Sequence, residues 1–178
     1  TRRSSDLEPS VFLRSLEVDA ERLEQIAEAE LQATASQRAN AEALAHFNKG
    51  LELVRQLPST ESAIRSEIQL LTGLGPVIQA TTGVASPQCE ELYNQARTQC
   101  EKLGDRTQLF GVLVNLWLLS THRGQLDAAQ DLSHRLLTTA TMHAEPDLVM
   151  QAHHAAWATH FFRGEFTDVL ASVVDGCG

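Results

Sequence analysis

Apolar residues recur every three or four positions along most of the chain, which is the period of one face of an α-helix. The pattern predicts eight helical segments, over residues 10–36, 40–57, 60–82, 86–104, 105–122, 126–140, 146–163 and 166–174. No segment shows the two-residue alternation that is typical of a half-buried β-strand. The sequence therefore predicts an all-α fold. Residues 1–9 hold little that could be buried, and we expect them to be flexible.

Serine, glycine and proline mark several features of the predicted helices. Ser86 can cap a helix whose first turn accepts Pro87, because proline lacks the N–H that would be left unpaired there. Gly73, Gly75 and Pro76 lie inside the third predicted helix. Since proline removes a helical hydrogen bond and glycine weakens a helix, these three residues predict a bend or a break.

Predicted helices that are apolar on most sides alternate with helices that keep a polar face. Residues 105–122 are apolar nearly all round, whereas residues 126–140 show one narrow apolar stripe. Matching residues also lie 40 positions apart, namely Trp117 and Trp157, Arg123 and Arg163, and Gly124 and Gly164. A period near 40 residues is typical of stacked helical hairpins. The sequence predicts a tetratricopeptide-like solenoid of about four hairpins over residues 10–178, with Gly124 in the turn between residues 105–122 and 126–140.

Three stretches resemble a known family: NAEALAHFNKGLELVRQLP at 40–58, LGPVIQATTGVASP at 74–87 and QLFGVLVNLWLLSTHRGQLDAAQDLSHRLL at 108–137. They are similar to the C-terminal tetratricopeptide-like region of large bacterial proteins that join a class III adenylate/guanylate cyclase domain, or another effector, to a signalling P-loop ATPase. The resemblance covers roughly residues 30–174. It implies that the chain is a piece of a longer multidomain parent.

In such parents the cyclase and ATPase domains precede the region that this chain resembles. The sequence itself has neither GxxxxGKS nor GxxxxGKT, the loop that holds nucleotide phosphates in a P-loop ATPase. We therefore expect the chain not to be an enzyme and to act as a protein-interaction or regulatory module of a signalling protein.

The charge balance argues against two classes of partner. With 14 Lys+Arg against 23 Asp+Glu, the formal net charge is −9. Nucleic acids and anionic membrane surfaces attract basic proteins, so we expect no nucleic acid and no membrane as a partner. The longest mainly apolar run, residues 110–119, is also shorter than the roughly 20 residues that a membrane-spanning helix needs.

The three cysteines, Cys89, Cys100 and Cys177, show no metal-finger spacing, and their odd number argues against a disulfide framework. This usage is typical of reduced thiols in the cytoplasm, where we expect the protein to be. Cys89 and Cys100 fall on the apolar stripe of their predicted helix, which favours packing over nucleophilic catalysis.

Other groups that resemble active sites have simpler interpretations. His153 and His160 could share a helix face, but zinc needs three or four ligands, and two histidines seven residues apart do not match the spacing of zinc-binding helices. Solvation and the helix dipole explain the paired carboxylates, which are Glu90 with Glu91 and Asp127 with Asp131. We expect no catalytic residue, no metal and no cofactor.

The inner helices of such a solenoid line its concave surface. The residues predicted to face this groove are Val114, Asn115, Leu118, Gln151, His154, Ala158 and Phe161. Because most are apolar and none is a lysine or an arginine, the groove favours an apolar or helical protein segment, or another domain of the parent chain, over an acidic tail. Two alternatives stay open: these residues pack between hairpins, or a small ligand binds near Trp117, His154 and Trp157.

The last predicted helix carries an apolar stripe that includes Phe166, Val169, Leu170 and Val173. Terminal repeats of solenoids normally show a polar outer face, so an uncovered stripe favours association. We expect self-association through these residues, as a symmetric homodimer, because one patch can meet its own copy.

Overall fold

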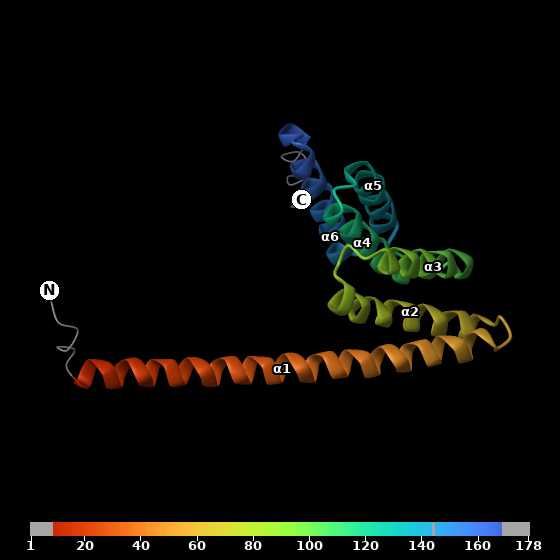
Figure 1. The fold of residues 1–178 in the computed structure, drawn as a ribbon. Helices are drawn as coiled ribbons and strands as arrows, with labels where there is room; N and C mark the ends of the chain where they lie inside the picture. The colour runs from red at the N-terminus through yellow and green to blue at the C-terminus, as the bar shows by residue number, and fades with distance from the viewer. Residues whose placement is uncertain (1–8, 144, 169–178) are drawn as a thin grey trace. The chain divides into compact units, whose positions relative to one another are not determined.

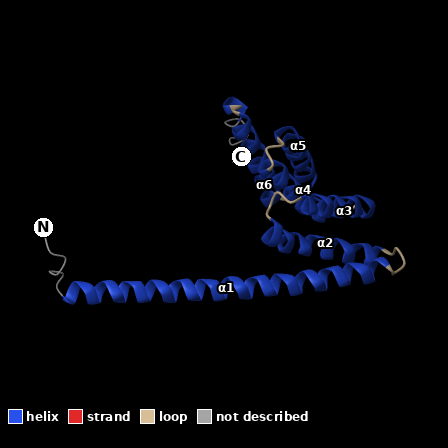
Figure 2. Ribbon diagram, in the orientation of Figure 1, coloured by secondary structure: helices blue, strands red, loops and turns tan. Residues whose placement is uncertain are grey.

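The computed structural model describes residues 9–143 and 145–168, with the backbone alone described at residues 9–21, 23, 24, 26 and 143. Its helices are α1 (Pro9–Arg55), α2 (Glu61–Thr82), α3 (Pro87–Leu103), α4 (Arg106–His122), α5 (Leu126–His143) and α6 (Pro146–Arg163). Residues 166–168 are helical as well. The described residues contain no β-strand, so the predicted all-α, helical-hairpin class is confirmed (Figures 1 and 2). Val169, Leu170 and Val173, which were predicted to associate, lie outside the described residues.

The chain divides into two compact units, Thr1–Glu42 and Ala43–Gly178. The sequence predicted one repeat domain over residues 10–178 and did not indicate this division. Helix α1 runs through the boundary, so that its residues up to Glu42 belong to the first unit and its last turns belong to the second. The helical hairpins and their core lie in the second unit.

Helix α1 is one continuous element, although the sequence predicted two helices, over residues 10–36 and 40–57. That prediction was wrong because the apolar stripe changes face between the two segments while the backbone stays helical. Residues 37–39 contain neither glycine nor proline, so nothing local ends the helix there. In the first unit, every described side chain over residues 27–39 is exposed.

Helix α2 runs unbroken through the point where a bend or a break was predicted, and Gly73, Gly75 and Pro76 all lie inside it. The two glycines permit close packing. A Cβ atom on Gly75 would lie 2.1 Å from Oη of Tyr93 in α3, and one on Gly73 would lie 2.7 Å from Cε1 of Phe47 in α1. Real Cβ contacts essentially never fall below 3.0 Å. Only glycine therefore lets these two aromatic rings approach the α2 backbone so closely.

Three turns share one hydrogen-bond pattern at a glycine of positive φ. The angles are 70° at Gly104, 69° at Gly124 and 77° at Gly164. In each turn the N–H that follows the glycine donates to a carbonyl five residues earlier, from Asp105 to Cys100, Gln125 to Ser120 and Glu165 to His160. This Schellman motif satisfies carbonyls that the helix end leaves unpaired. The turn predicted at Gly124 is confirmed, and its φ is positive.

Two arginines 40 residues apart link the end of one helix to the start of another. Arg123 follows α4 and pairs with Glu90 in the first turn of α3, and its Nε also donates to the Ala85 carbonyl at 2.9 Å. Arg163 ends α6 and pairs with Asp127 in the first turn of α5 at 2.6 Å. The repeat seen in the sequence is therefore also a repeat of contacts.

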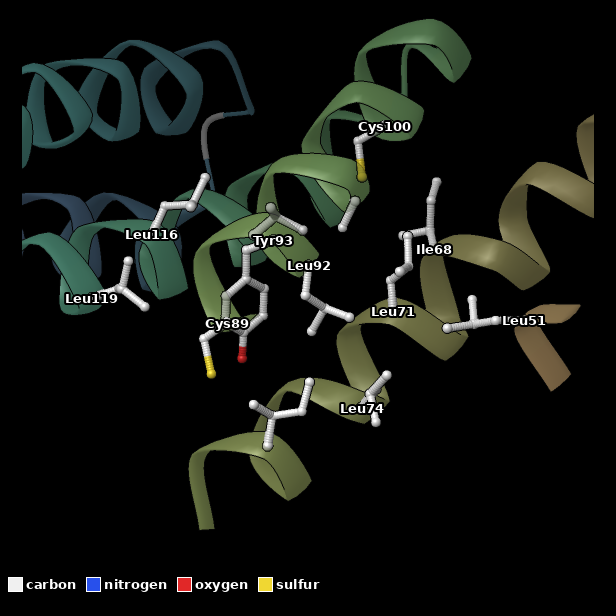
Figure 3. Close-up of a cluster of buried hydrophobic side chains, with 13 residues drawn as sticks. Leu51, Ile68, Leu71, Leu74, Cys89, Leu92, Tyr93, Cys100, Leu116 and Leu119 are labelled. Atoms are coloured by element: carbon white, nitrogen blue, oxygen red, sulfur yellow. The ribbon is translucent and has the colours of Figure 1, made fainter. Parts of the chain in front are cut away.

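The core of the second unit consists of two clusters. The first joins the last turns of α1 with α2, α3 and α4 (Figure 3). The second joins α4, α5 and α6, where the α6 contribution is mainly alanine. Helix α4 belongs to both, with Val112, Leu116 and Leu119 in the first cluster and Phe110, Leu113 and Trp117 in the second. Burial on two sides explains why its sequence is apolar nearly all round.

We predict that Gly75→Ala destabilises the protein by about 1–3 kcal/mol, because the added methyl group would collide with the buried Tyr93. Gly111→Ala is the matched control, since Gly111 is also inside a helix but no heavy atom of another helix lies within 4 Å of the added methyl group. This control should gain up to about 1 kcal/mol from the better helix propensity of alanine. Urea unfolding measures both, and equal changes in the two variants would contradict the packing argument.

Gly124→Val should cost about 1–2 kcal/mol or more, because a β-branched side chain strains at a φ of 69°. No heavy atom lies within 4 Å of the added Cβ, so backbone strain alone is measured. Gly124→Asn should lose less, because asparagine tolerates the left-handed region. Thermal unfolding compares the two variants, and a melting temperature of Gly124→Val equal to that of the wild type would refute the strain argument.

Candidate interaction surface

Four of the seven residues predicted to line a groove contribute to packing. Val114 and Leu118 are half-buried against the second core cluster, to which Ala158 belongs. The half-buried Asn115 donates its side-chain N–H to the carbonyl of Gly111, one turn earlier in α4, at 2.9 Å. Val114, Leu118 and Ala158 therefore pack between helices, and the amide of Asn115 bonds to its own helix.

The other three, Gln151, His154 and Phe161, are exposed on α6. The His154 ring stacks on Trp157, with ring centroids 5.1 Å apart, and lies 6.2 Å from the ring of Trp117 in an edge-on arrangement. The structure thus brings together the three rings near which the sequence suggested a small-ligand site. These rings pack directly on one another.

A buried hydrogen bond fixes Trp117 in this cluster. Its Nε1 donates to Oγ1 of Thr159 in α6 at 2.8 Å, and the Thr159 hydroxyl donates to the Ala155 carbonyl at 2.7 Å. Trp117 is 7% exposed and Thr159 is 1% exposed. Because the indole has one donor and this donor is occupied, Trp117 serves to join α4 to α6.

An aromatic patch lies at the C-terminal end of α6. Phe161, Phe162 and Phe166 are 51%, 56% and 62% exposed, and the ring of Phe161 meets both others edge-on. Phe166 is the one described member of the stripe predicted to self-associate. Its exposure is compatible with that prediction, which stays a prediction.

A groove that the sequence analysis missed lies between the last turns of α1 and the helices α2 and α3. This α1–α3 groove has a volume of about 630 Å³. Its apolar residues are Leu44, Leu51, Leu71, Leu74, Ile78 and Leu92. Its polar residues are Asn48, Arg55, Thr81, Thr82, Gln88, Glu91 and Gln95. The groove therefore combines an apolar floor with a rim that can form hydrogen bonds.

Each of the three helices presents a single face to the α1–α3 groove. On α1 the lining residues are spaced by four, three and four positions, from Leu44 through Asn48 and Leu51 to Arg55. This is helical spacing, so the sequence did contain the signal. It was missed because nothing local shows that this face of α1 meets both α2 and α3.

The only arginine of the rim already has partners. Arg55 Nη2 donates to Gln95 Oε1 at 2.9 Å, and Arg55 Nε pairs with Glu67 Oε1 at 3.2 Å. Glu67 also accepts a hydrogen bond from Gln99 at 2.7 Å. Since the cation is offset by a neighbouring carboxylate, the rim offers mainly neutral hydrogen-bonding groups at this end.

One carboxylate of each pair that resembles a catalytic site is engaged in an ion pair. Glu90 and Asp127 bind the arginines that link successive helices. Glu165 lies between His160 Nδ1 and Arg163 Nε, each 2.8 Å away, and these hydrogen bonds, with that of His160 first, lower the pKa of Glu165.

The same region contains the one group of metal-ligating side chains found among the described residues. His160, Glu165 and Asp168 have ligand atoms that lie within 4.8 Å of one another. Both oxygens of Glu165 are already occupied, one by His160 and the other by Arg163. The arrangement is therefore explained as an ion-pair network at the end of α6.

Both described thiols are buried and lack the features of nucleophiles. Burial raises the pKa of Cys89, and it raises the pKa of Cys100 to about 11, with the nearby carboxylate of Asp105 adding to the effect. A thiol reacts as its thiolate, so these two side chains are largely unreactive at neutral pH. The predicted packing role agrees with their places in the first core cluster (Figure 3).

We predict that Cys100 resists iodoacetamide at pH 8 in the folded protein, because little thiolate forms below a pKa of about 11 and the side chain is buried. Unfolding in urea should restore the reactivity of an ordinary thiol. Mass spectrometry of the peptide that contains Cys100 measures the alkylated fraction. Equal alkylation rates with and without urea would contradict the assignment.

Comparisons with known proteins give one distant relative. No protein-family model matches the chain, and no solved structure matches it. An uncharacterized protein of Rhizobium meliloti (strain 1021) is 25% identical over 146 residues, which cover 80% of this chain and 14% of that protein. The chain thus matches a small part of a much longer relative. None of the described helices is both long enough and apolar enough to cross a membrane.

Proposed function

We propose that the chain is a non-catalytic helical-repeat module that binds an apolar protein segment in the α1–α3 groove. The groove is the observation that carries the proposal, since it offers six apolar side chains within a volume of about 630 Å³. Five of these side chains are at most 8% exposed and also belong to the first core cluster, so a partner would cover their remaining surface together with the half-buried Leu44. The partner is a segment of another protein or of another domain in the parent chain.

The dimensions of the groove favour a short helix as the bound segment. Its lining on α1 extends from Leu44 to Arg55, and eleven steps of 1.5 Å correspond to roughly 16 Å. A helix of about three turns has this length and satisfies its own backbone hydrogen bonds. Its apolar face would meet the leucines, and its polar flanks would meet the amides of Asn48, Gln88 and Gln95.

The chemistry of the titratable groups supports a binding role. Glu90, Asp127 and Glu165 are held in ion pairs, and Cys89 and Cys100 are buried thiols of raised pKa. General acid–base and nucleophilic catalysis both need a reactive group that faces substrate space. The two thiols are buried in the core, and the three carboxylates are held by arginine or histidine side chains.

A multidomain parent is supported by the relative, of which this chain matches only 14%. The identity of the other domains rests on the sequence resemblance alone. We propose a signalling ATPase or cyclase-like parent on that basis. The cytoplasmic location expected from the cysteine usage likewise stays a prediction.

The small-ligand alternative near Trp117, His154 and Trp157 has weaker support. Its three rings pack on one another, and the indole donor of Trp117 is used by Thr159. A ligand would bind only at the exposed side of His154 unless this cluster opened. The α1–α3 groove needs no such rearrangement.

A blocked groove tests the proposal. Twelve-residue peptides selected on phage against the wild-type protein should carry apolar residues at helical spacing, and they should bind Gln88→Trp at least about tenfold more weakly. Gln88 is an exposed rim residue, so its substitution fills the groove without disturbing the core. Thr138→Trp places the same side chain at an exposed position of α5 outside the groove and should bind like the wild type. Equal binding to both variants would refute the groove as the site.

A further inference from the structure

A second cleft follows the α1–α3 groove along the stack of helices. It is lined by α3, α4 and α5 and has a volume of about 400 Å³; we call it the α3–α5 cleft. Its apolar residues are Leu116, Leu119, Ala128 and Leu132, and two of them, Leu116 and Leu119, are seen in Figure 3. Its polar residues are Glu90, Asn94, Arg97, Ser120, Gln125, Asp131 and Arg135. Its lining contains four apolar residues, against six in the α1–α3 groove, and seven polar or charged residues, as in that groove.

The hydroxyl of Ser120 is the first feature that points to a ligand. Ser120 is 6% exposed and lines the cleft, yet its side chain has no hydrogen-bond partner among the described residues. Nearby buried or half-buried hydroxyls behave differently, since Thr121, Ser133 and Thr159 each donate to a carbonyl of their own helix. A buried polar group without a partner costs free energy, so an unfilled donor beside a cleft indicates that something else satisfies it.

The distribution of charge in the cleft is the second feature. Glu90 pairs with Arg123, and Arg135 pairs with Glu101, so these two lining residues are neutralised within the protein. Arg97 of α3 and Asp131 of α5 have no ion-pair partner in the described part of the chain, and they do not pair with each other. The cleft therefore holds one free cation and one free anion among its described residues, contributed by two different helices.

The α1–α3 groove provides an internal comparison. The arginine at its rim, Arg55, is satisfied by Glu67 and by Gln95. An unpaired arginine is therefore not a requirement of packing three consecutive helices in this fold.

From these features we infer that the α3–α5 cleft binds a small zwitterion of the amino-acid class. Its carboxylate meets the guanidinium of Arg97, a geometry that can form two parallel hydrogen bonds. Its ammonium meets the carboxylate of Asp131, and the Ser120 hydroxyl donates to the ligand at the bottom of the cleft. Leu116, Leu119 and Leu132 provide an apolar surface for the remainder of the ligand. This site is separate from the α1–α3 groove and does not depend on the function proposed for it.

Isothermal titration calorimetry tests the inference with the twenty standard L-amino acids as probes, each measured singly at concentrations up to about 10 mM. At least one should bind, and its N-acetyl and its carboxamide derivatives, which each lack one charge, should both bind at least about tenfold more weakly. Failure of all twenty to bind, or undiminished binding of either derivative, overturns the inference.

Variants then assign the contacts. The affinity for the amino acid should fall at least about fivefold in each of three variants, Arg97→Gln, Asp131→Asn and Ser120→Ala. Arg97→Gln should also bind the acid and its carboxamide with equal affinity, because the group that distinguishes them is gone. Arg106→Gln removes an arginine outside the cleft and should bind like the wild type. Far-ultraviolet circular dichroism shows that each variant is folded. Wild-type affinity in a folded Arg97→Gln variant overturns the assignment.

Discussion

The close contact between Gly75 and Tyr93 determines how α2 and α3 pack, and the α1–α3 groove depends on that packing. Tyr93 is 1% exposed and its hydroxyl lies where a Cβ of residue 75 would be. Leu74 and Ile78, which flank this point on α2, and Leu92, which precedes the tyrosine on α3, all line the groove. Gly73 makes an analogous contact with Phe47 of α1. The two glycines therefore let α1 and α3 pack closely on α2, the helix that contributes Leu71, Leu74 and Ile78 to the groove.

The turns and the arginines then repeat this packing along the chain. A Schellman turn at Gly124 ends α4, and Arg123 beside it returns to the first turn of α3 through Glu90. Gly164 and Arg163 repeat the arrangement at the end of α6, where the partner is Asp127 of α5. Each turn reverses the chain, while the adjacent arginine links the end of the helix before the turn to the start of the preceding helix. Exposed ion pairs add little stability individually, so their contribution here is mainly to geometry.

Local signals predicted much of the fold, whereas contacts between distant segments were not predictable. Ser86 caps α3 and Gly104 ends it, as the sequence indicated, because caps and left-handed glycines act within one turn. The sequence indicated a bend or a break at Gly75 but not its packing role, since that role depends on Tyr93 in another helix. The predicted groove on α4 and α6 included residues that pack inside, such as Ala158, because the sequence shows an apolar face without showing what covers it. Ser120 gave no signal at all, since its lack of a partner among the described residues is visible only in three dimensions.

Helix α3 shows how one repeat architecture can produce two different binding chemistries. Gln88, Glu91 and Gln95 face the α1–α3 groove, while Glu90, Asn94 and Arg97 face the α3–α5 cleft, and both sets have the spacing of a single helix face. Each of the two sites is lined by three consecutive helices, so their difference in chemistry lies in the residues of the middle helix, which is α2 in the α1–α3 groove and α4 in the α3–α5 cleft. On α2 that helix contributes Leu71, Leu74 and Ile78, and on α4 it contributes Leu116, Leu119 and Ser120. The leucines and Ile78 also belong to the first core cluster, so the packing of the helices constrains these positions, whereas Ser120 introduces a hydroxyl beside that core and thereby changes the chemistry of the second cleft.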